Sequence, residues 1–237
     1  MKLALVLLTL LNLTNIAQKP VPMKAVERSR KAADVLESAM AKPEARIPKA
    51  LLSKAVAVAV ITEMKTVGFL IEGGGQGYGV VTRRLPNGKW SPAGYIHMAA
   101  LQVGRPQLHA RSFNVILLFM NDKSADRFLE KAGFMFDREK APVAGPIGEI
   151  KTEEKEVVPV ADVFSYVFDD GRLQSVDLKN KLTNVGLAFD NNLNKATYGV
   201  ALADILTDAD GRKVSRSHSE VAAFSDTVSR FFVPEER

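Results

Sequence analysis

The sequence predicts an α+β fold in which a curved, mostly antiparallel and barrel-like β-sheet is flanked by helices at the N- and C-termini. Short β-branched runs bounded by turn residues recur through the middle of the chain, which is typical of strands. Runs without glycine or proline, with apolar residues at helical spacing, stand near both ends. A glycine-dense stretch, GGGQGYG at 73–79, favours a sheet that bends sharply.

Composition limits the classes of protein to consider. The 237 residues are 46% hydrophobic and 25% charged, which is ordinary for a globular chain. No cysteine is present, which excludes disulfides, thiol catalysis and thiolate metal sites. The net charge of +5 favours anionic surfaces, but no concentrated basic run indicates a nucleic-acid partner.

The first seventeen residues, MKLALVLLTLLNLTNIA, predict a signal peptide. A lysine at position 2 precedes an apolar run, and Ala17 offers a small residue at a cleavage point. The alternative, an uncleaved membrane anchor, needs about 20 apolar residues, which this run does not reach. We therefore expect an exported protein, periplasmic or extracellular and peripheral on a membrane.

Two helices are predicted after the signal peptide. Residues 18–22, QKPVP, form an extended linker because prolines interrupt any helix there. Residues 23–40 lack glycine and proline and place Val26, Ala33, Leu36 and Met40 near one face of a helix. Pro48 then opens a second short helix.

Strands are predicted from the β-branched runs that follow. VAVAVI at 56–61, VGFLI at 67–71 and GYGVVTRR at 77–84 each suit a short strand. LPNGKW at 85–90 supplies a hairpin turn, and SFNVILLFM at 112–120 suits a strand buried on both faces. A helix then starts at NDKSADRFLEKAG.

The second half predicts further strands and a closing helix. ADVFSYVF, RLQSVDL and NVGLAFD indicate a strand meander, with a turn at DDG, and NNLNKATYG a helical turn. Residues 219–232 form an amphipathic helix with Val221, Phe224, Val228 and Phe231 on one side. No repeat or long linker divides residues 23–237, so we expect one domain.

The glycine stretch does not fit a phosphate-binding loop. It lacks the Gly-Lys-Ser/Thr end of a Walker loop and the spacing of a dinucleotide fingerprint. Read as a strand, it places Gly75, Gly77 and Gly79 on one side and Gln76 and Tyr78 on the other. We expect these glycines to permit close backbone approach.

No pattern of residues indicates catalysis or a metal. His97, His109 and His218 stand in separate segments without metal-ligand spacing. TDADG at 207–211 has too few oxygen ligands for a calcium loop and is followed by two cations. No G-x-S-x-G elbow is present. We expect neither an enzyme nor a cofactor.

Basic residues concentrate at the start of the mature chain. The predicted binding residues are Lys24, Arg28, Arg30, Lys31, Arg46 and Lys49. An amphipathic helix with such cations can lie in a membrane interface, its apolar side in the lipid. It can equally pack its apolar stripe on the sheet, and charge and periodicity alone favour this packing.

Several segments together resemble the SYLF lipid-binding domain family. The first set runs from RIPKALLSKAVAVAVI to VGFLIEGGGQGYGVVTRRLPNGKWSPAGYI, and AGPIG, VFSYVF, DDGRLQSVDL and DNNLNKATYG follow in the family's order. The resemblance covers residues 46–206. The chain departs from it where relatives carry a proline after the first strand and Gly-Leu-Phe in the second-half hairpin.

The resemblance implies a function in lipid binding. It implies no known catalytic activity, and binding of acidic phospholipids, phosphoinositides in eukaryotic relatives, through basic surface and an N-terminal amphipathic helix. Some eukaryotic relatives also bind actin, which an exported chain would not meet inside its own cell. Our hypothesis is an exported protein that docks residues 23–40 on an anionic leaflet.

Two other hypotheses stay open. One is an envelope interaction or structural protein without a lipid ligand, which would use the sheet and the closing helix to bind an unknown protein. The other is a hydrolase whose site has no recognisable motif, because catalytic triads are defined by geometry.

Overall fold

The computed structural model describes residues 20–69, 72–103, 111–130, 133–136, 141–148, 161–176, 178, 183–214 and 219–233. The predicted signal peptide at 1–17 and the start of the linker at 18–22 lie outside these residues. So do His109 and His218.

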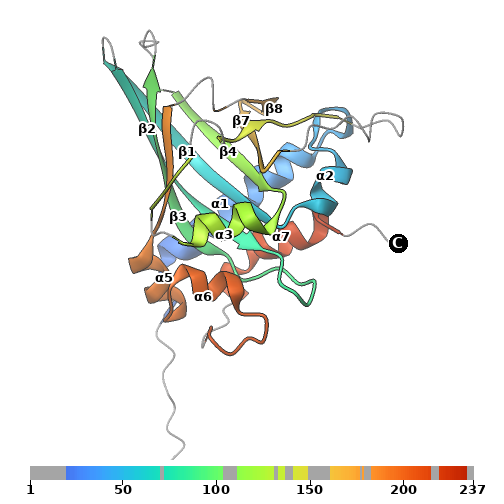
Figure 1. Ribbon diagram of the computed structural model, residues 1–237, viewed down its shortest axis with the longest axis vertical. Coiled ribbons are helices and arrows are strands. Elements are labelled where there is room, and N and C mark those ends of the chain that lie inside the picture. The colour runs from blue at the N-terminus through green and yellow to red at the C-terminus, as the bar shows by residue number, and fades with distance from the viewer. Residues whose placement is uncertain are drawn as a thin grey trace, which may run out of the picture.

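One strongly curled sheet organises the fold (Figure 1). Its strand order is β5-β9-β3-β2-β1-β4-β7-β6, and β8 pairs with β7. The strands are β1 (Ala57–Phe69), β2 (Glu72–Arg83), β3 (Gly94–Val103), β4 (Arg111–Phe119), β5 (Gly133–Met135), β6 (Val143–Ala144), β7 (Val163–Asp169), β8 (Arg172–Ser175) and β9 (Thr183–Phe189). Only β6 and β7 pair in parallel among the described strands, so the predicted curved, mostly antiparallel sheet is confirmed.

The two strands predicted at 56–61 and 67–71 are one strand. β1 runs on from Ala57 to Phe69, and its register shifts between Thr62 and Lys65 against β2. At this bulge Glu63 has a φ of 51°, a left-handed conformation that is rare for residues other than glycine. The prediction missed the connection because a bulge breaks the alternation of side chains without ending the strand.

The predicted meander is correct for its first hairpin and wrong for its last strand. β7 and β8 pair around a turn at Asp170 and Gly171, both at positive φ. β9, however, leaves this edge and inserts between β3 and β5, on the far side of the sheet. Sheet order depends on long-range packing, which the local sequence of β9 does not encode.

Glycines on β2 permit close approach, as predicted. A Cβ on Gly77 would lie 2.6 Å from Ile61 Cγ2 of β1. One on Gly79 would lie 2.9 Å from the Cα of Ile61 and would overlap the carbonyl oxygen of Val60. Side chains here would push β1 and β2 apart, so the glycines allow the curl.

Helix α3 (Asp122–Glu130) packs against one face of the curled sheet (Figure 1). The ring of Phe128 lies 6.0 Å from the ring of Phe119 on β4 and 5.3 Å from that of Phe189 on β9. These two strands have three others between them in the sheet, so one side chain joins distant parts of the curl. We call this side the α3 face.

Helix α1 (Met23–Met40) covers the opposite face, which we call the α1 face. Its predicted bounds are confirmed, but its apolar stripe is buried: Ala25, Ala32, Leu36 and Met40 are in the core. The hypothesis that this stripe enters a membrane is wrong for the folded chain, because the stripe already packs on β1, β2 and α7.

The remaining helices fill the ends of the molecule. They are the 3₁₀ turn η1 (Pro43–Ala45), α2 (Lys49–Lys54), α5 (Asn191–Tyr198), α6 (Leu202–Thr207), the 3₁₀ turn η3 (Ser219–Val221) and α7 (Ala223–Phe231). In α7, Phe224 and Val228 are fully buried and Phe231 is half-buried. Phe224 and Val228 of the closing helix therefore belong to the core, and Phe231 remains partly exposed.

Candidate functional site: a polar hollow beside α1

Two adjoining depressions lie between α1 and the sheet, and we call them together the α1 hollow. They have volumes of about 530 and 340 Å³ and share Lys24, Gln76, Gly77 and Tyr78. The larger one reaches His97 and Asp190, and the smaller one reaches Arg28 and Glu63. These residues come from α1, from three neighbouring strands and from the end of β9.

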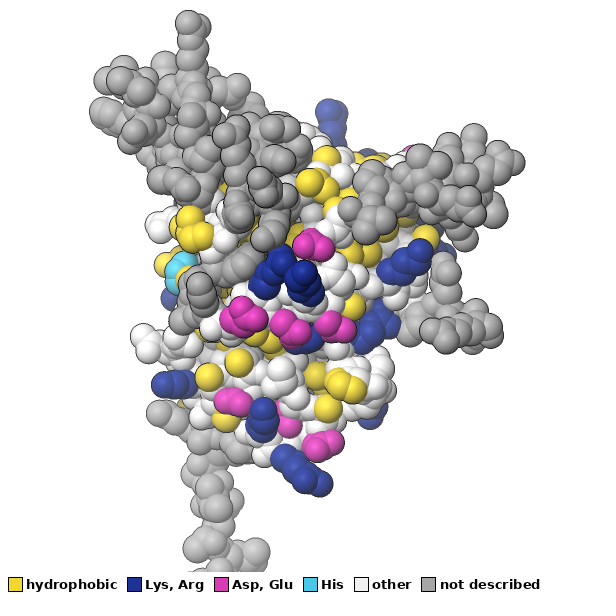
Figure 2. Space-filling view, viewed as in Figure 1, with side chains coloured by type: hydrophobic (Ala, Val, Ile, Leu, Met, Phe, Trp, Pro, Cys, Tyr) yellow, Lys and Arg dark blue, Asp and Glu magenta, His cyan; other side chains and the backbone are white. Residues whose placement is uncertain are grey.

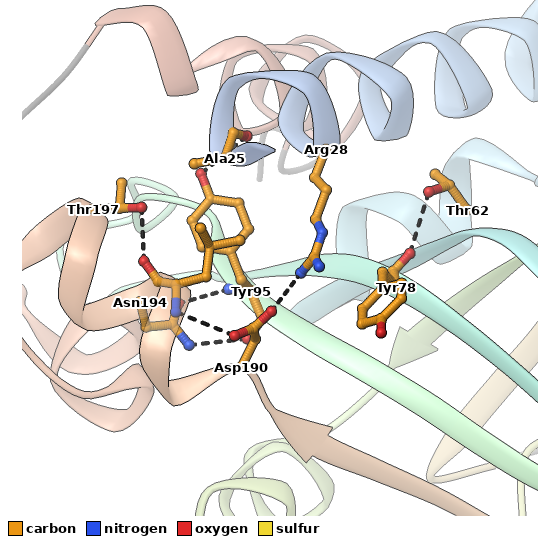
Figure 3. Close-up of polar contacts among 9 residues, drawn as sticks. Ala25, Arg28, Thr62, Tyr78, Tyr95, Asp190, Asn194 and Thr197 are labelled. Carbon is orange, nitrogen blue, oxygen red and sulfur yellow. Dashed lines mark hydrogen bonds and ion pairs between the residues drawn. The ribbon is translucent and has the colours of Figure 1, made fainter. Parts of the chain in front are cut away.

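Arg28 is buried in the wall of this hollow rather than lying on the surface. Its side chain is only 7% exposed, and Nη1 donates a hydrogen bond of 2.8 Å to Oδ2 of Asp190 (Figure 3). The sequence predicted a solvated cation on the polar side of α1. Arg28 instead lies between α1 and the ring of Tyr78 on β2, so its guanidinium needs a partner inside the fold.

Asp190 holds its position because β9 and α5 meet there. Its Oδ1 accepts the backbone N–H of Leu193 and caps α5, and its own N–H donates to the carbonyl of Tyr95 on β3. Asn194 exchanges two further hydrogen bonds with the Tyr95 backbone (Figure 3). The end of β9, strand β3 and helix α5 thus fix the carboxylate that faces Arg28.

The pKa of Asp190 is lowered below its ordinary value. Burial by itself raises it, but hydrogen bonds from Arg28 and from the Leu193 backbone, and the charges of Arg28 and Lys24, lower it by more. The carboxylate is therefore ionised at neutral pH and forms a true ion pair with the guanidinium.

Tyr78 lies under two cations at once. The Arg28 guanidinium carbon is 4.3 Å from the centre of the ring, and Lys24 Nζ is 5.2 Å from it. Both distances fall within the range of cation–π attraction. Tyr78 is 48% exposed, and His97 stands opposite it on β3 with its ring 6.4 Å away.

Lys31 stands at the other end of the smaller depression and is neutralised. Its Nζ lies 3.3 Å from a carboxylate oxygen of Glu27 and 3.1 Å from one of Glu63, the residue at the β1 bulge. The hydrogen bonds from Lys31 to Glu63 and Glu27 raise the pKa of the lysine. The bulge thus directs an acidic side chain toward α1.

The six residues predicted for lipid binding do not form one cluster. Lys24, Arg28 and Lys31 line the α1 hollow, and Arg30 is exposed on the outer side of the helix. The half-buried Arg46 and the exposed Lys49 lie near α2, beyond the other end of α1. An 18-residue helix is about 27 Å long, so these two are remote from Lys24.

Sequence reasoning missed most other residues of the hollow, among them Gln76, Tyr78, His97 and Asp190. A signal existed for Tyr78, which is a large aromatic residue on the outward side of a glycine-rich strand. Asp190 begins the DNNLN segment, a typical helix N-cap. No local pattern could show that these two residues share one hollow with α1.

Other features of the described residues carry no comparable site. No group of three or more metal-binding side chains occurs among them. The segment at 207–211, which the sequence argues is not a calcium loop, contains Asp208. Both carboxylate oxygens of Asp208 accept backbone N–H groups, from Arg212, Lys213 and Val214. Within the described part of the chain, no helix has the length and apolar character needed to span a bilayer.

Comparison with known proteins places this chain in a family. Residues 101–230, more than half of the chain, match the family described as Ysc84, Las17-binding protein actin regulator. The chain belongs to the Ysc84 family. This confirms the SYLF resemblance. The matched range contains Asp190 but neither α1 nor β2, so it does not cover most of the α1 hollow.

Relatives of this Ysc84-family chain include three vertebrate proteins named SH3 domain-containing YSC84-like protein 1. The Xenopus laevis protein is 26% identical over 185 residues, which is 76% of this chain and 53% of the relative. The Bos taurus and Homo sapiens proteins are 26% identical over 165 residues, 68% of this chain and 48% and 47% of theirs. The chain thus spans about half the length of these relatives. No solved structure matches it significantly.

Proposed function

We propose that this chain is a non-enzymatic protein that binds anionic phospholipid surfaces with the first half of α1 and the rim of the α1 hollow. The observation that carries the proposal is the charge of this region. Four basic residues and one acidic residue occupy positions 24–31. Lys24 and Arg30 are exposed, and Lys31 is half-buried. Membership of the Ysc84 family supports the proposal.

The mode of contact differs from insertion of an amphipathic helix. Because the apolar stripe of α1 is already packed, the surface offers cations beside a few exposed apolar groups. Met23 is 78% exposed and Tyr78 48% exposed, and both flank Lys24. Each cation near an anionic membrane contributes about 1 kcal/mol, so several suffice for reversible binding.

Vesicle co-sedimentation tests this proposal. Binding to phosphatidylcholine vesicles that contain phosphatidylglycerol is expected, with release as salt rises from about 0.1 to about 0.5 M. The double variant K24E/R30E should weaken binding at least about tenfold. The control K89E/K123E makes the same charge change at exposed lysines in the β2–β3 turn and on α3. Equal binding to neutral vesicles, or equal losses in both double variants, would contradict the proposal.

We also propose that the chain is exported, on the strength of its first seventeen residues. N-terminal sequencing of the protein recovered from fractionated cells tests this. A mature chain that begins at Gln18 outside the cytoplasm is expected, and an intact Met1 in the cytoplasmic fraction would contradict it.

A further inference from the structure

The first part of α1, residues 23–33, borders the α1 hollow, and we call it the strap. All the α1 residues that line the hollow belong to it, namely Lys24, Glu27, Arg28 and Lys31. The rest of the helix, residues 34–40, continues past the hollow, and we call it the anchor. The strap and the anchor are held to the fold by different kinds of contact.

The strap begins without the features that stabilise the start of a helix. Its N-cap is Pro22, whose side chain makes no capping hydrogen bond, and its first turn contains no acidic residue. The first turn instead carries Lys24, a cation at the positive end of the helix dipole. By contrast, α5 begins at Asp190, whose carboxylate accepts the N–H of Leu193. The sequence of the strap therefore favours fraying from its N-terminal end.

Burial of apolar side chains holds the strap weakly. Its buried apolar side chains are all alanines, and Val26 is only half-buried. The anchor, in contrast, buries Leu36 and Met40. An alanine methyl removes far less apolar surface from water than a leucine or methionine side chain does. The hydrophobic effect therefore fixes the anchor more firmly than the strap.

Hydrogen bonds supply much of what holds the strap closed. The hydroxyl of Ser29 donates a bond of 2.7 Å to the carbonyl oxygen of Val221, and the hydroxyl of Tyr95 donates one of 3.2 Å to the carbonyl oxygen of Ala25 (Figure 3). When the strap opens, these groups exchange one another for water. The net stabilisation from each bond is therefore modest.

Arg28 makes the closed position costly. Its Nη1 pairs with Asp190, but the buried Nη2 has no hydrogen-bond partner among the described residues. A buried donor without an acceptor loses its hydration without compensation. Lys24 approaches the same Tyr78 ring as Arg28, so two cations are held close together and repel each other. Opening of the strap hydrates Nη2 and lets the two cations separate.

We propose that the strap opens and closes over the α1 hollow by local unfolding of residues 23–33, while the anchor and the sheet stay folded. Local opening is typical of segments that few apolar contacts hold in place. The open state exposes the floor of the hollow on β2, which contains Gln76, Gly77 and Tyr78. The strap thus controls access to the hollow. It opens in solution and needs no membrane, so it stands or falls apart from the membrane function.

Amide hydrogen exchange, followed by NMR, tests the opening. Amides at 27–33 should exchange at least about tenfold faster than amides at 36–40. Urea below the unfolding transition should accelerate exchange at 27–33 less than at 36–40, because a local opening exposes less surface than global unfolding does. Equal rates with equal urea dependence would show that α1 opens only together with the whole fold, and would overturn the proposal.

Two substitutions should shift the opening in opposite directions. Pro22→Asp supplies the missing N-cap and should slow exchange at 27–33 by about fivefold. Pro86→Asp makes the same replacement in the exposed β2–β3 turn and should leave exchange in α1 unchanged. Asp190→Asn removes the charge that pairs with Arg28 and should speed exchange at 27–33 by about fivefold or more. Equal effects of the two proline replacements, or unchanged exchange at 27–33 in Asp190→Asn, would contradict the proposal.

The absence of cysteine from the chain permits a second measurement. Ala25→Cys in the strap and Ala39→Cys in the anchor each place a single thiol at a buried position of α1. Iodoacetamide should label the strap thiol at least about tenfold faster than the anchor thiol in the folded chain. In urea-unfolded chains the two thiols should react at the same rate. Labelling of both thiols at one rate in the folded chain would rule the strap out.

Discussion

The two faces of the sheet each contain a largely buried arginine, and the two arginines differ in how many of their guanidinium nitrogens have a partner. On the α3 face, Arg83 uses both terminal nitrogens, with Nη2 2.8 Å from Asp122 and Nη1 2.7 Å from Asp126. On the α1 face, Arg28 has one partner, Asp190, and a buried nitrogen without one. The satisfied arginine joins a helix to the sheet, whereas the half-satisfied one lines a hollow.

Charge distribution follows the same division. Figure 2 shows basic and acidic side chains interspersed on the side of the molecule where α3 and α6 lie in Figure 1. Ion pairs such as Arg127 with Asp162 and Lys213 with Asp204 account for part of this pattern. Exposed pairs of this kind contribute little to stability. Arg83 on the α3 face therefore has a partner for both terminal nitrogens, whereas Arg28 on the α1 face lines a hollow with one nitrogen unpaired.

The largest loss of stability is expected at Gly79, where the α3 face leaves no space for a side chain. Gly79→Ala would drive a Cβ into the main chain of Val60 and Ile61, atoms that cannot rotate away. We expect a loss of about 3 kcal/mol in the free energy of unfolding, measured by urea denaturation. Gln76→Ala, exposed on the α1 side of the same strand, should cost about 0.5 kcal/mol or less. Similar losses in both variants would remove the contrast between the faces.

An intermediate loss of stability is expected when Asp190, the partner of Arg28, is replaced. Asp190→Ala leaves a buried cation and removes the cap of α5, and should cost about 2 kcal/mol. Asp190→Asn can retain the cap and should cost less. Asp122→Asn leaves Arg83 its second carboxylate and should cost less than about 1 kcal/mol. If Asp122→Asn costs as much as Asp190→Ala in urea denaturation, the two arginines are equivalent.

The smallest change in stability is expected when the pH is lowered and Asp190 is protonated. Because the pKa of Asp190 is lowered in the folded state, its contribution to stability is complete above the ordinary value of 3.8 and is lost as the pH falls through the native pKa. The difference in free energy of unfolding between wild type and Asp190→Asn should therefore be constant above this value and shrink below it. Urea denaturation at several pH values measures this. A difference that grows on acidification would show that Arg28 does not stabilise the charged carboxylate.

Much of the secondary structure could be predicted from the sequence. The bounds of α1, the short helix after Pro48, the buried strand at 112–120 and the turn at 85–90 all follow from nearby residues. The role of the glycines on β2 was also predictable, because a Walker or dinucleotide loop demands residues that this stretch lacks. Errors arose at the β1 bulge and at β9, where pairing with distant strands decides the outcome.

The candidate site was predictable only in part. Lys24, Arg28 and Lys31 were recognised as basic residues on one helix, but Arg46 and Lys49 were grouped with them because they are near in sequence. The structure separates these two from the hollow by the length of α1. Tyr78 and Asp190, which define the surroundings of Arg28, come from distant segments.

The sequence by itself determined where the chain forms most of its helices and strands, the absence of thiol chemistry and the excess of cations in the first half of α1, since these depend on composition and on neighbouring residues. Only the tertiary structure decided which of those cations are buried, that the apolar stripe of α1 belongs to the core, and that a hollow exists beside it. The physical reason is distance along the chain. Arg28 and Asp190 are 162 positions apart, and they meet only because the sheet curls and brings β9 beside β3.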